Sequence, residues 1–247
     1  MAHKTLIDGT AYDVTGGRCL VDGTGYGIQK GRTLVDGTGY DVSFTQTLGD
    51  LAPGSVVYIN ESKSPVEFYV ANHNYEDGLN GVGRTLLVRK ALSSSLKFSA
   101  SRNDYASSSI DDWLNDDYKT RFDASVRAAI GETTFYCREY PTEAATTLTR
   151  SVFLLSLKEL GATSSTAVSE GSEVSIASTL KGIAYDTGGT ARDWWLRTAS
   201  LSSTSRAWYV AKDGDITTAS VTGAKYIRPC FTLPDTTLVS DDLQVIV

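Results

Sequence analysis

The alternation of apolar and polar residues divides the chain at about residue 45. The first part contains one 14-residue unit three times, as KTLIDGTAYDVTGG (4–17), RCLVDGTGYGIQKG (18–31) and RTLVDGTGYDVSFT (32–45). Asp-Gly is a strong signal for a tight turn because glycine adopts positive φ without a steric penalty, and β-forming residues flank it on both sides. Each unit is therefore predicted to form a small hairpin with two strands of about four residues.

A hairpin of this size cannot bury an apolar face by itself, because isolated two-stranded hairpins are marginal in water. The three copies are therefore expected to stack on one another or on other chains. The repeated Asp8, Asp22 and Asp36 raise the alternative of calcium loops. Turn geometry explains them better, because the serial Gly-x-Asp copies of such loops are missing. We assign residues 1–45 to attachment or oligomerisation, with a homo-oligomer expected and a trimer as one option.

From residue 46 onward no repeat continues, and residues 46–247 have the pattern of one domain. Alternating apolar and polar positions, bounded by turn residues, predict several strands. These are VVYIN (56–60), EFYVANHNY (67–75), GRTLLVRKAL (83–92), RAWYVAK (206–212), DITTASV (215–221) and a closing YIRPCFTL (226–233).

Helical spacing marks residues 104–131, where Ser109 is the expected N-cap and Gly131 the expected end. The apolar run 151–161 fits a buried strand followed by a helical turn. The Ser/Thr-rich stretch 162–179 is expected to be a loop with few core residues. Strands, helices and then strands again, without βαβ alternation, predict an α+β fold with an antiparallel sheet.

Composition narrows the range of partners. The net charge is −6 and no run of lysine and arginine exceeds two residues, which disfavours a nucleic acid or an anionic membrane as the ligand. Cys19, Cys137 and Cys230 form no metal-binding or disulfide spacing, and are expected to be reduced and mostly buried. We find no apolar signal-peptide core near Met1 and no run of about 20 apolar residues, so we expect synthesis in the cytoplasm and no membrane insertion.

Five blocks of the sequence carry a resemblance to a known family. DWWLRTAS (193–200), AWYVAKDGDI (207–216) and YIRPCFTL (226–233) are similar to a domain family of unknown function that is widespread in Gram-positive bacteria and their phages. SIDDWLNDDY (109–118) and SVFLLSLKEL (151–160) match two further blocks of that family in the right order. The 14-residue repeats resemble those that precede this domain in phage structural proteins.

The family looks like a variant of the C-type-lectin and formylglycine-generating-enzyme fold. The resemblance thus implies a C-type-lectin-like α+β domain over residues 46–247, with an antiparallel sheet and one or two helices. It further implies a bacteriophage virion protein, on the capsid or the tail, that contacts other virion proteins through residues 1–45. Such a protein is expected to present its lectin-like domain to a host-surface glycan or protein.

The predicted ligand contacts lie near the last hairpins. Arginine and exposed aromatic residues are typical of binding hot spots, although Trp195, Trp208 and Arg228 are expected to belong to the core. Better candidates are Trp194 and the small, polar, loop-borne residues between these anchors. The predicted contacts are Arg192, Asp193, Trp194, Ser200, Ser202, Ser203, Thr204, Arg206, Lys225 and Tyr226.

The sequence offers little for catalysis or for binding a metal ion. His73 is the only histidine outside the N-terminal segment, and a lone histidine is usually structural or solvated. Cys137 and Cys230 lack the motifs of a reactive pair, and Trp113-Leu114-Asn115-Asp116 only echoes a calcium-lectin motif. We therefore expect no enzyme, no cofactor and no metal. Two alternatives stay open, a virion-associated carbohydrate-active hydrolase and a purely structural decoration that stabilises the particle.

Overall fold

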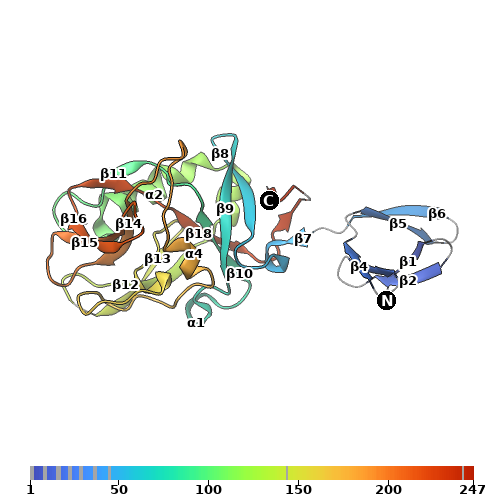
Figure 1. The fold of residues 1–247 in the computed structure, drawn as a ribbon, viewed down its shortest axis with the longest axis horizontal. Coiled ribbons are helices and arrows are strands. Elements are labelled where there is room, and N and C mark those ends of the chain that lie inside the picture. The colour runs from blue at the N-terminus through green and yellow to red at the C-terminus, as the bar shows by residue number, and fades with distance from the viewer. Residues whose placement is uncertain are drawn as a thin grey trace.

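The computed structural model describes residues 46–142, 144–240 and 242–247 with their side chains, and the backbone of six strands within residues 3–43. The fold is mostly β, with 37% of the chain in strands and 18% in helices, which is compatible with the predicted α+β class. A larger body, which we call the head, begins at residue 46, and the six N-terminal strands lie beyond one end of it (Figure 1).

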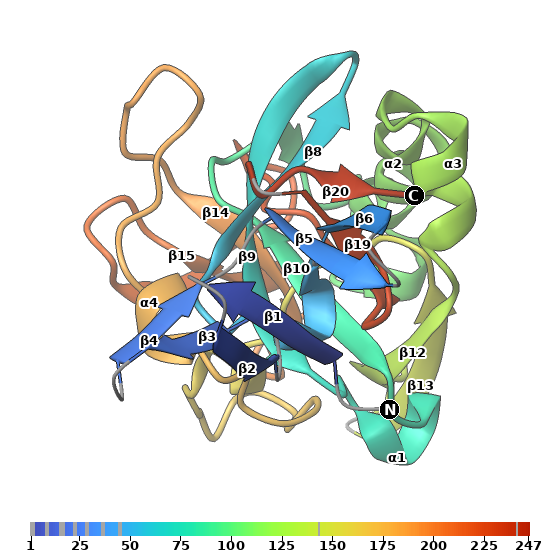
Figure 2. The ribbon, with the colours of Figure 1, turned by 90° about the vertical axis from the view of Figure 1, so that its right-hand side faces the viewer.

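The six N-terminal strands pair as three antiparallel hairpins, one for each sequence repeat. The pairs are β1 (His3–Ile7) with β2 (Thr10–Val14), β3 (Arg18–Val21) with β4 (Thr24–Gly27), and β5 (Lys30–Val35) with β6 (Thr38–Ser43). In each hairpin two residues separate the last paired positions, as an Asp-Gly turn requires, although those two residues lie outside the described ones. β2 lies beside β3 and β1 beside β5, so the hairpins stack as predicted (Figure 2).

Two larger sheets and two small ones build the head. One sheet has the order β18 (Cys230–Pro234), β10 (Arg84–Arg89), β9 (Ser64–His73) and β8 (Val56–Glu61), and the other has the order β11 (Ser95–Lys97), β17 (Ala224–Tyr226), β14 (Trp194–Ala199), β15 (Arg206–Val210) and β16 (Ile216–Ser220). β12 (Thr133–Arg138) pairs with β13 (Ala145–Arg150), and β19 (Leu238–Val239) pairs with β20 (Val245–Ile246) and with β7 (Gln46–Thr47).

The chain enters the head through β7, whose pairing with β19 ties the residues after the repeats to the C-terminal segment. Figure 1 shows β7 and the five-stranded sheet at opposite ends of the head. Among the strands that the structure describes, every pair is antiparallel except β14 with β17, where Trp194 faces Tyr226 in parallel register.

The helices are short. They are α1 (Asp77–Asn80), α2 (Ser109–Asp116), α3 (Ala124–Ala129) and α4 (Ala177–Leu180), together with 3-10 turns at Leu48–Asp50, Tyr105–Ser107, Tyr118–Arg121 and Lys158–Leu160. The predicted helical stretch is thus confirmed, but the N-cap of α2 is Ser108, whose Oγ accepts from the amide of Asp111, and not Ser109. In the described part of the chain, none of the helices is long and apolar enough to cross a membrane.

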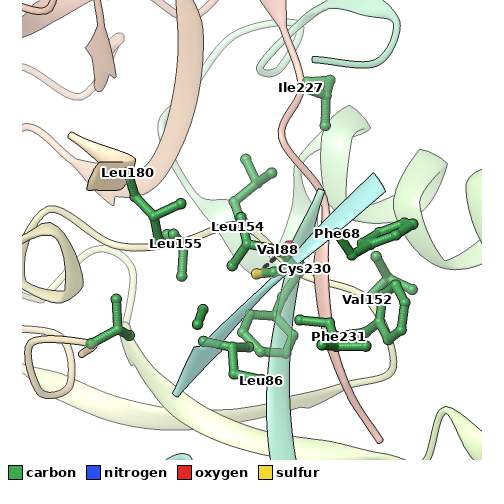
Figure 3. Close-up of a cluster of buried hydrophobic side chains, with 14 of the residues drawn as sticks. Phe68, Leu86, Val88, Val152, Leu154, Leu155, Leu180, Ile227, Cys230 and Phe231 are labelled. Carbon is green, nitrogen blue, oxygen red and sulfur yellow. Dashed lines mark hydrogen bonds between the residues drawn. The ribbon is translucent and has the colours of Figure 1, made fainter. Parts of the chain in front are cut away.

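The core lies between the four-stranded sheet and the segment that follows β13. Phe68 packs edge to face on Phe231 at 5.3 Å, and Val152 and Leu154 approach from that segment (Figure 3). The Cys230 thiol donates to the Phe153 carbonyl at 3.0 Å. Cys137 and Cys230 are free and buried, as the sequence indicated, whereas the side chain of Cys19 lies outside the described residues.

Three segments differ from the sequence prediction. The run 152–157 is buried but irregular, and only one bridge, between Phe153 and Cys230, joins it to a strand. The stretch 162–179 contributes more to the interior than its composition suggests, because the side chain of Glu170 is completely buried there. The predicted closing strand 226–233 is divided between β17 and β18, which belong to different sheets.

Candidate functional site

The central strand β14 is buried on both sides, and this changes the predicted contact surface. Neighbouring residues of a strand point to opposite faces of the sheet, so Trp194 packs against Arg228 on one face and Trp195 against Phe98 on the other. Neither indole has any exposed surface, and Ser200, directly after the strand, is also buried. The structure therefore removes Trp194 and Ser200 from the residues that could touch a ligand.

Arg192 and Tyr226 come together at the end of the sheet where β14 begins. The guanidinium carbon of Arg192 lies 5.3 Å from the centroid of the Tyr226 ring, within the range of a cation–π contact. The Nε atom of Arg192 donates to Oδ2 of Asp186 at 2.8 Å. This hydrogen bond raises the pKa of Arg192, so the side chain is held in place and charged.

Asp186 organises the loop that leads into β14. Its Oδ1 atom accepts from the amides of Gly188 and Thr190, each at 3.0 Å. The Thr190 amide and the Arg192 guanidinium hold the pKa of this carboxyl below its ordinary value. Gly189 adopts a φ of +76°, a conformation that favours glycine and lets the turn close. These hydrogen bonds fix the backbone of the loop and hold the Arg192 side chain in position.

Asp193 and Lys225 also meet, but on the opposite face of the sheet from Arg192. Lys225 Nζ lies 2.8 Å from Asp193 Oδ2 and 3.5 Å from the ring centroid of Tyr209. Partial burial works against ionisation of Asp193, yet the Lys225 ammonium and the Lys212 amide outweigh it and hold the pKa below its ordinary value. The side chain of Lys225 is only 11% exposed, so this pair braces the sheet more than it offers surface.

The remaining predicted contacts lie at the other end of β14, in the turn after it and at the first residue of β15. They are Ser202, Ser203, Thr204 and Arg206. The buried Asn103 fixes this turn, because its Nδ2 donates to the carbonyls of Ser200, Ser203 and Arg206. Arg206 reaches across to Thr218 on the neighbouring strand. The ten predicted residues thus fall at two separate ends of β14 and do not form one surface.

Two exposed apolar residues on the segment paired with Ala191 were missed from the sequence. The pairing of Tyr185 with Ala191 places their side chains on the opposite face from that of Arg192. Ile183 and Tyr185 are 48% and 50% exposed, and the amide of Arg192 bonds the carbonyl of Ala184 that lies between them. The signal that could have revealed them is a pair of large apolar residues in a glycine-rich polar loop, where no core pattern claims them. We call Ile183, Tyr185, Arg192 and Tyr226 together the tyrosine patch.

Arg197 belongs to a buried polar cluster and not to any surface. Its two terminal nitrogens bind the two carboxylate oxygens of Glu159 at 2.7 Å each, and both side chains are fully buried. Tyr75 donates to the same carboxylate at 2.5 Å. Burial opposes the charge on Arg197, but Glu159 outweighs it and lifts the pKa of Arg197 well above its ordinary value. The charged groups of this cluster are hydrogen-bonded to one another, and the cluster is therefore a structural part of the core.

Glu170 extends this cluster from the Ser/Thr-rich stretch. It accepts from the Arg138 amide at 2.8 Å and from the Thr198 hydroxyl at 2.5 Å. Burial raises the pKa of its carboxyl. Thr198 is a neighbour of Arg197 on β14, so the two glutamates hold consecutive residues of the central strand.

The residues considered for catalysis and calcium are engaged in structural contacts. His73 ends β9, two residues before the end of the predicted strand, and its ring nitrogens lie 2.7 Å from the Leu51 carbonyl and 2.8 Å from the Thr85 hydroxyl. Asn115 binds the backbone of Ser151 and Val152. Across the described residues, no group of three or more His, Cys, Asp and Glu side chains could hold a metal ion.

Comparison with known proteins gives one match. A family described as a domain of unknown function, DUF6273, matches residues 82–235, which include the tyrosine patch and the buried Arg197–Glu159 pair. No curated protein matches the chain. No solved structure matches it either. Because the matched segment covers more than half of the chain, this protein belongs to the DUF6273 family.

Proposed function

We propose that this chain is a non-enzymatic binding protein of a bacteriophage particle, which attaches through residues 1–45 and binds a host-surface glycan or protein through the tyrosine patch. The observation that carries the proposal is the exposure of Ile183 and Tyr185 on the short segment that pairs with the residues leading into β14, where Asp186 fixes Arg192. Large exposed apolar residues grouped with arginine and tyrosine are the composition of binding hot spots.

The scaffold of the patch supports binding without rearrangement. Tyrosine supplies a large contact area at a low entropic cost, and its hydroxyl serves polar ligands. The Asp186 turn and the strand pairing at Tyr226 fix the backbone on both sides of the patch. A ligand would therefore meet a surface that is already ordered, which limits the entropy lost on binding.

The N-terminal segment supports attachment. Three stacked hairpins precede β7, and β7 enters the head at the end opposite the five-stranded sheet (Figure 1). A chain mounted through this segment would direct its sheet away from the mounting point. Many copies on one particle would convert weak single contacts into firm attachment through avidity.

The groups that a hydrolase would need are held away from a substrate. Both ring nitrogens of His73 are occupied, and Asp111, 3% exposed, is paired with Arg150 at 2.8 Å. We therefore favour binding over the carbohydrate-active alternative. For the fold, we propose that the head is of the C-type-lectin-like type, since short helices and irregular loops surround its two sheets.

Electron microscopy of phage particles tests the assignment to a virion. An antibody raised against the full chain should label one defined part of the particle, the capsid or the tail. Particles assembled without the chain should lose attachment to cells while keeping their thermal stability. Labelling confined to the soluble fraction of a lysate would contradict the proposal. A loss of particle stability with attachment intact would favour the purely structural alternative.

A further inference from the structure

A groove of about 340 Å³ lies between α2 and β11, at one edge of the five-stranded sheet (Figure 1). Its volume falls in the range of about 300–1,000 Å³ that is usual for small-ligand sites. We call it the α2 groove, and the side chains that line it include Leu96 and Lys97 from β11 and Asp112, Trp113, Asp116 and Asp117 from α2 and its C-cap. None of these residues belongs to the tyrosine patch.

The helical repeat explains why α2 presents these side chains together. Asp112, Trp113 and Asp116 are one, three or four positions apart, so they lie on the same side of the helix. Ile110 and Leu114, on another side, are buried in the core. Asp112 and Asp116 are about one helical turn apart, and Trp113 lies beside both.

Trp113 forms the aromatic wall of the groove, and its neighbours hold it in place. The guanidinium carbon of Arg121 lies 5.1 Å from an indole centroid, and the Tyr118 ring packs at 5.4 Å. The guanidinium donates to the hydroxyls of Ser93 and Ser94 at 3.3 Å each. Neither Arg121 nor Tyr118 lines the groove, and the indole is partly exposed. Part of the indole is therefore available to an apolar ligand surface.

The charge of the groove selects a cation. The carboxylates of Asp112, Asp116 and Asp117 are exposed, and no ion pair to them is found in the part of the chain that the structure describes. Only one lysine, Lys97, opposes these three acidic groups. Across the same part of the chain, no group of acidic side chains could hold a metal ion. The groove therefore suits an organic cation with an apolar body.

We infer that the α2 groove binds an amino sugar, a sugar ring with a protonated amine, within an amine-bearing glycan. The apolar side of the ring packs on Trp113 and Leu96, and the ammonium group lies at the carboxylates of Asp112 and Asp116. This is a second binding site of the head, in addition to the tyrosine patch.

The shape of the groove favours a sugar ring over a lysine side chain. A lysine also carries an ammonium group, but its narrow alkyl chain would fill little of a groove of about 340 Å³ and would cover little of the indole. Each exposed ion pair contributes about fivefold in affinity at most, so the packing on Trp113 has to supply the rest.

Binding of the full chain to three soluble oligomers tests the inference, at about pH 6 and physiological salt, where the amines and carboxylates are charged. A glucosamine hexamer carries free amines, an N-acetylglucosamine hexamer has the same rings with neutral amides, and hexalysine has ammonium groups without rings. We expect the glucosamine hexamer to bind at least about tenfold more tightly than the acetylated one. Hexalysine should bind more weakly than the glucosamine hexamer.

Substitutions in the groove and a matched control separate the site from the net charge. Asp112→Asn with Asp116→Asn should lower the affinity for the glucosamine hexamer about five- to twentyfold. Asp213→Asn with Asp215→Asn removes the same charge from the turn before β16, at the opposite edge of the sheet, and should change it less than about twofold. Trp113→Leu should lower it about threefold or more, because the ring is lost. Thermal unfolding checks that all three variants are folded.

Several outcomes would overturn the inference. These are no binding to the glucosamine hexamer, equal binding to the acetylated hexamer, unchanged binding by the variant at Asp112 and Asp116 or by folded Trp113→Leu, and an equal loss in the control. Tighter binding of hexalysine, lost in the variant at Asp112 and Asp116, would also overturn it, because the groove would then fit a basic peptide. The proposed function stands in each case, since the tyrosine patch is tested by substitution of Tyr185 and Tyr226.

Discussion

Arg192 and Arg197 lie five positions apart in one segment, yet they do opposite things. Arg197 is fully buried and its guanidinium is saturated by Glu159 and three backbone carbonyls. Arg192 lies at the edge of the same sheet and is 42% exposed. Its Nε atom is hydrogen-bonded to Asp186, and its two terminal nitrogens make no hydrogen bond to the residues that the structure describes. Both residues are arginines, so the residue type does not decide the role. The role depends on how many of the guanidinium N–H donors are hydrogen-bonded within the protein.

This contrast explains why the block DWWLRTAS (193–200), with its arginine and tryptophans, was a poor guide to the ligand-binding surface. A buried charge is tolerated only where partners satisfy it, so Arg197 and Glu159 define the core and cannot serve a ligand. An exposed charge such as that of Arg192 is hydrated where the protein supplies no partner, so it costs little folding free energy. It can exchange that water for a ligand. The predictions below test this division, starting from the buried cluster.

Loss of Arg197 should have the largest effect on stability. Arg197→Met leaves the carboxylate of Glu159 buried without its cation, which should lower the free energy of unfolding by about 3–5 kcal/mol. Urea denaturation of the full chain measures this. The double variant Arg197→Met with Glu159→Leu should recover part of the loss, because no unpaired charge remains. A loss below about 1 kcal/mol in the single variant would break the comparison.

The buried carboxyl of Asp111, paired with the partly exposed Arg150, should make stability depend on pH. Burial raises the pKa of Asp111 to about 6, although Arg150 opposes the shift. The folded chain therefore binds more protons than the unfolded chain between about pH 4 and 6. Stability that is present below pH 4 is lost as the pH rises through 6, by about 3 kcal/mol for a shift of this size.

Asp111→Asn isolates this contribution, because an amide does not titrate. Chemical denaturation at several pH values should show a flatter stability profile between pH 4 and 6 for the variant than for the parent chain. Glu170 shifts in the same direction but is present in both chains, so it cancels in the difference. Parallel profiles would show that Asp111 ionises as readily in the folded state as in the unfolded state.

Loss of Asn103 should have a smaller and more local effect. Asn103→Ala removes three hydrogen bonds to the turn 200–206, which should cost about 1–3 kcal/mol. Hydrogen exchange should become faster in that turn and stay unchanged at Tyr226, at the other end of the sheet. Faster exchange at both ends would contradict the separation of the two regions.

Substitution within the tyrosine patch should have the smallest effect on stability. Tyr185→Ser and Arg192→Gln remove exposed atoms, so each should change the free energy of unfolding by less than about 0.5–1 kcal/mol. Thermal unfolding measures this. A larger loss of unfolding free energy in either variant would show that the residue stabilises the fold, which would contradict its assignment to a binding surface.

The sequence predicted the strands, hairpins and helices that depend on a local pattern of residues. The Asp-Gly repeats became hairpins, and the run 56–60 became β8, which is one residue longer than expected. The run 67–75 became β9, which begins earlier, at Ser64, and ends earlier, at His73. Helical spacing located α2 and the 3-10 turn after it. Each of these elements depends on residues that are close together along the chain.

The rest depends on contacts between distant residues. Arg197 meets Glu159 across 38 positions and Asn103 meets Ser200 across 97, and no periodicity records such pairs. Ten contact residues were grouped because they are near the last hairpins, whereas the length of β14 and the pleat of the sheet separate them. Arg192 and Tyr226 stayed together at one end of β14, and Ser202, Ser203, Thr204 and Arg206 stayed together at the other. Tyr185 was found only from its exposure.

The most direct test of the tyrosine patch is an array of bacterial surface glycans probed with the full chain. The parent chain and Arg206→Gln should bind the same glycans with the same strength. The double variant Tyr185→Ser with Tyr226→Ser, folded to the same melting temperature within a few degrees, should lose at least about tenfold of that binding. Equal binding by all three chains would show that the ligand is held elsewhere, and the account of the patch would be wrong.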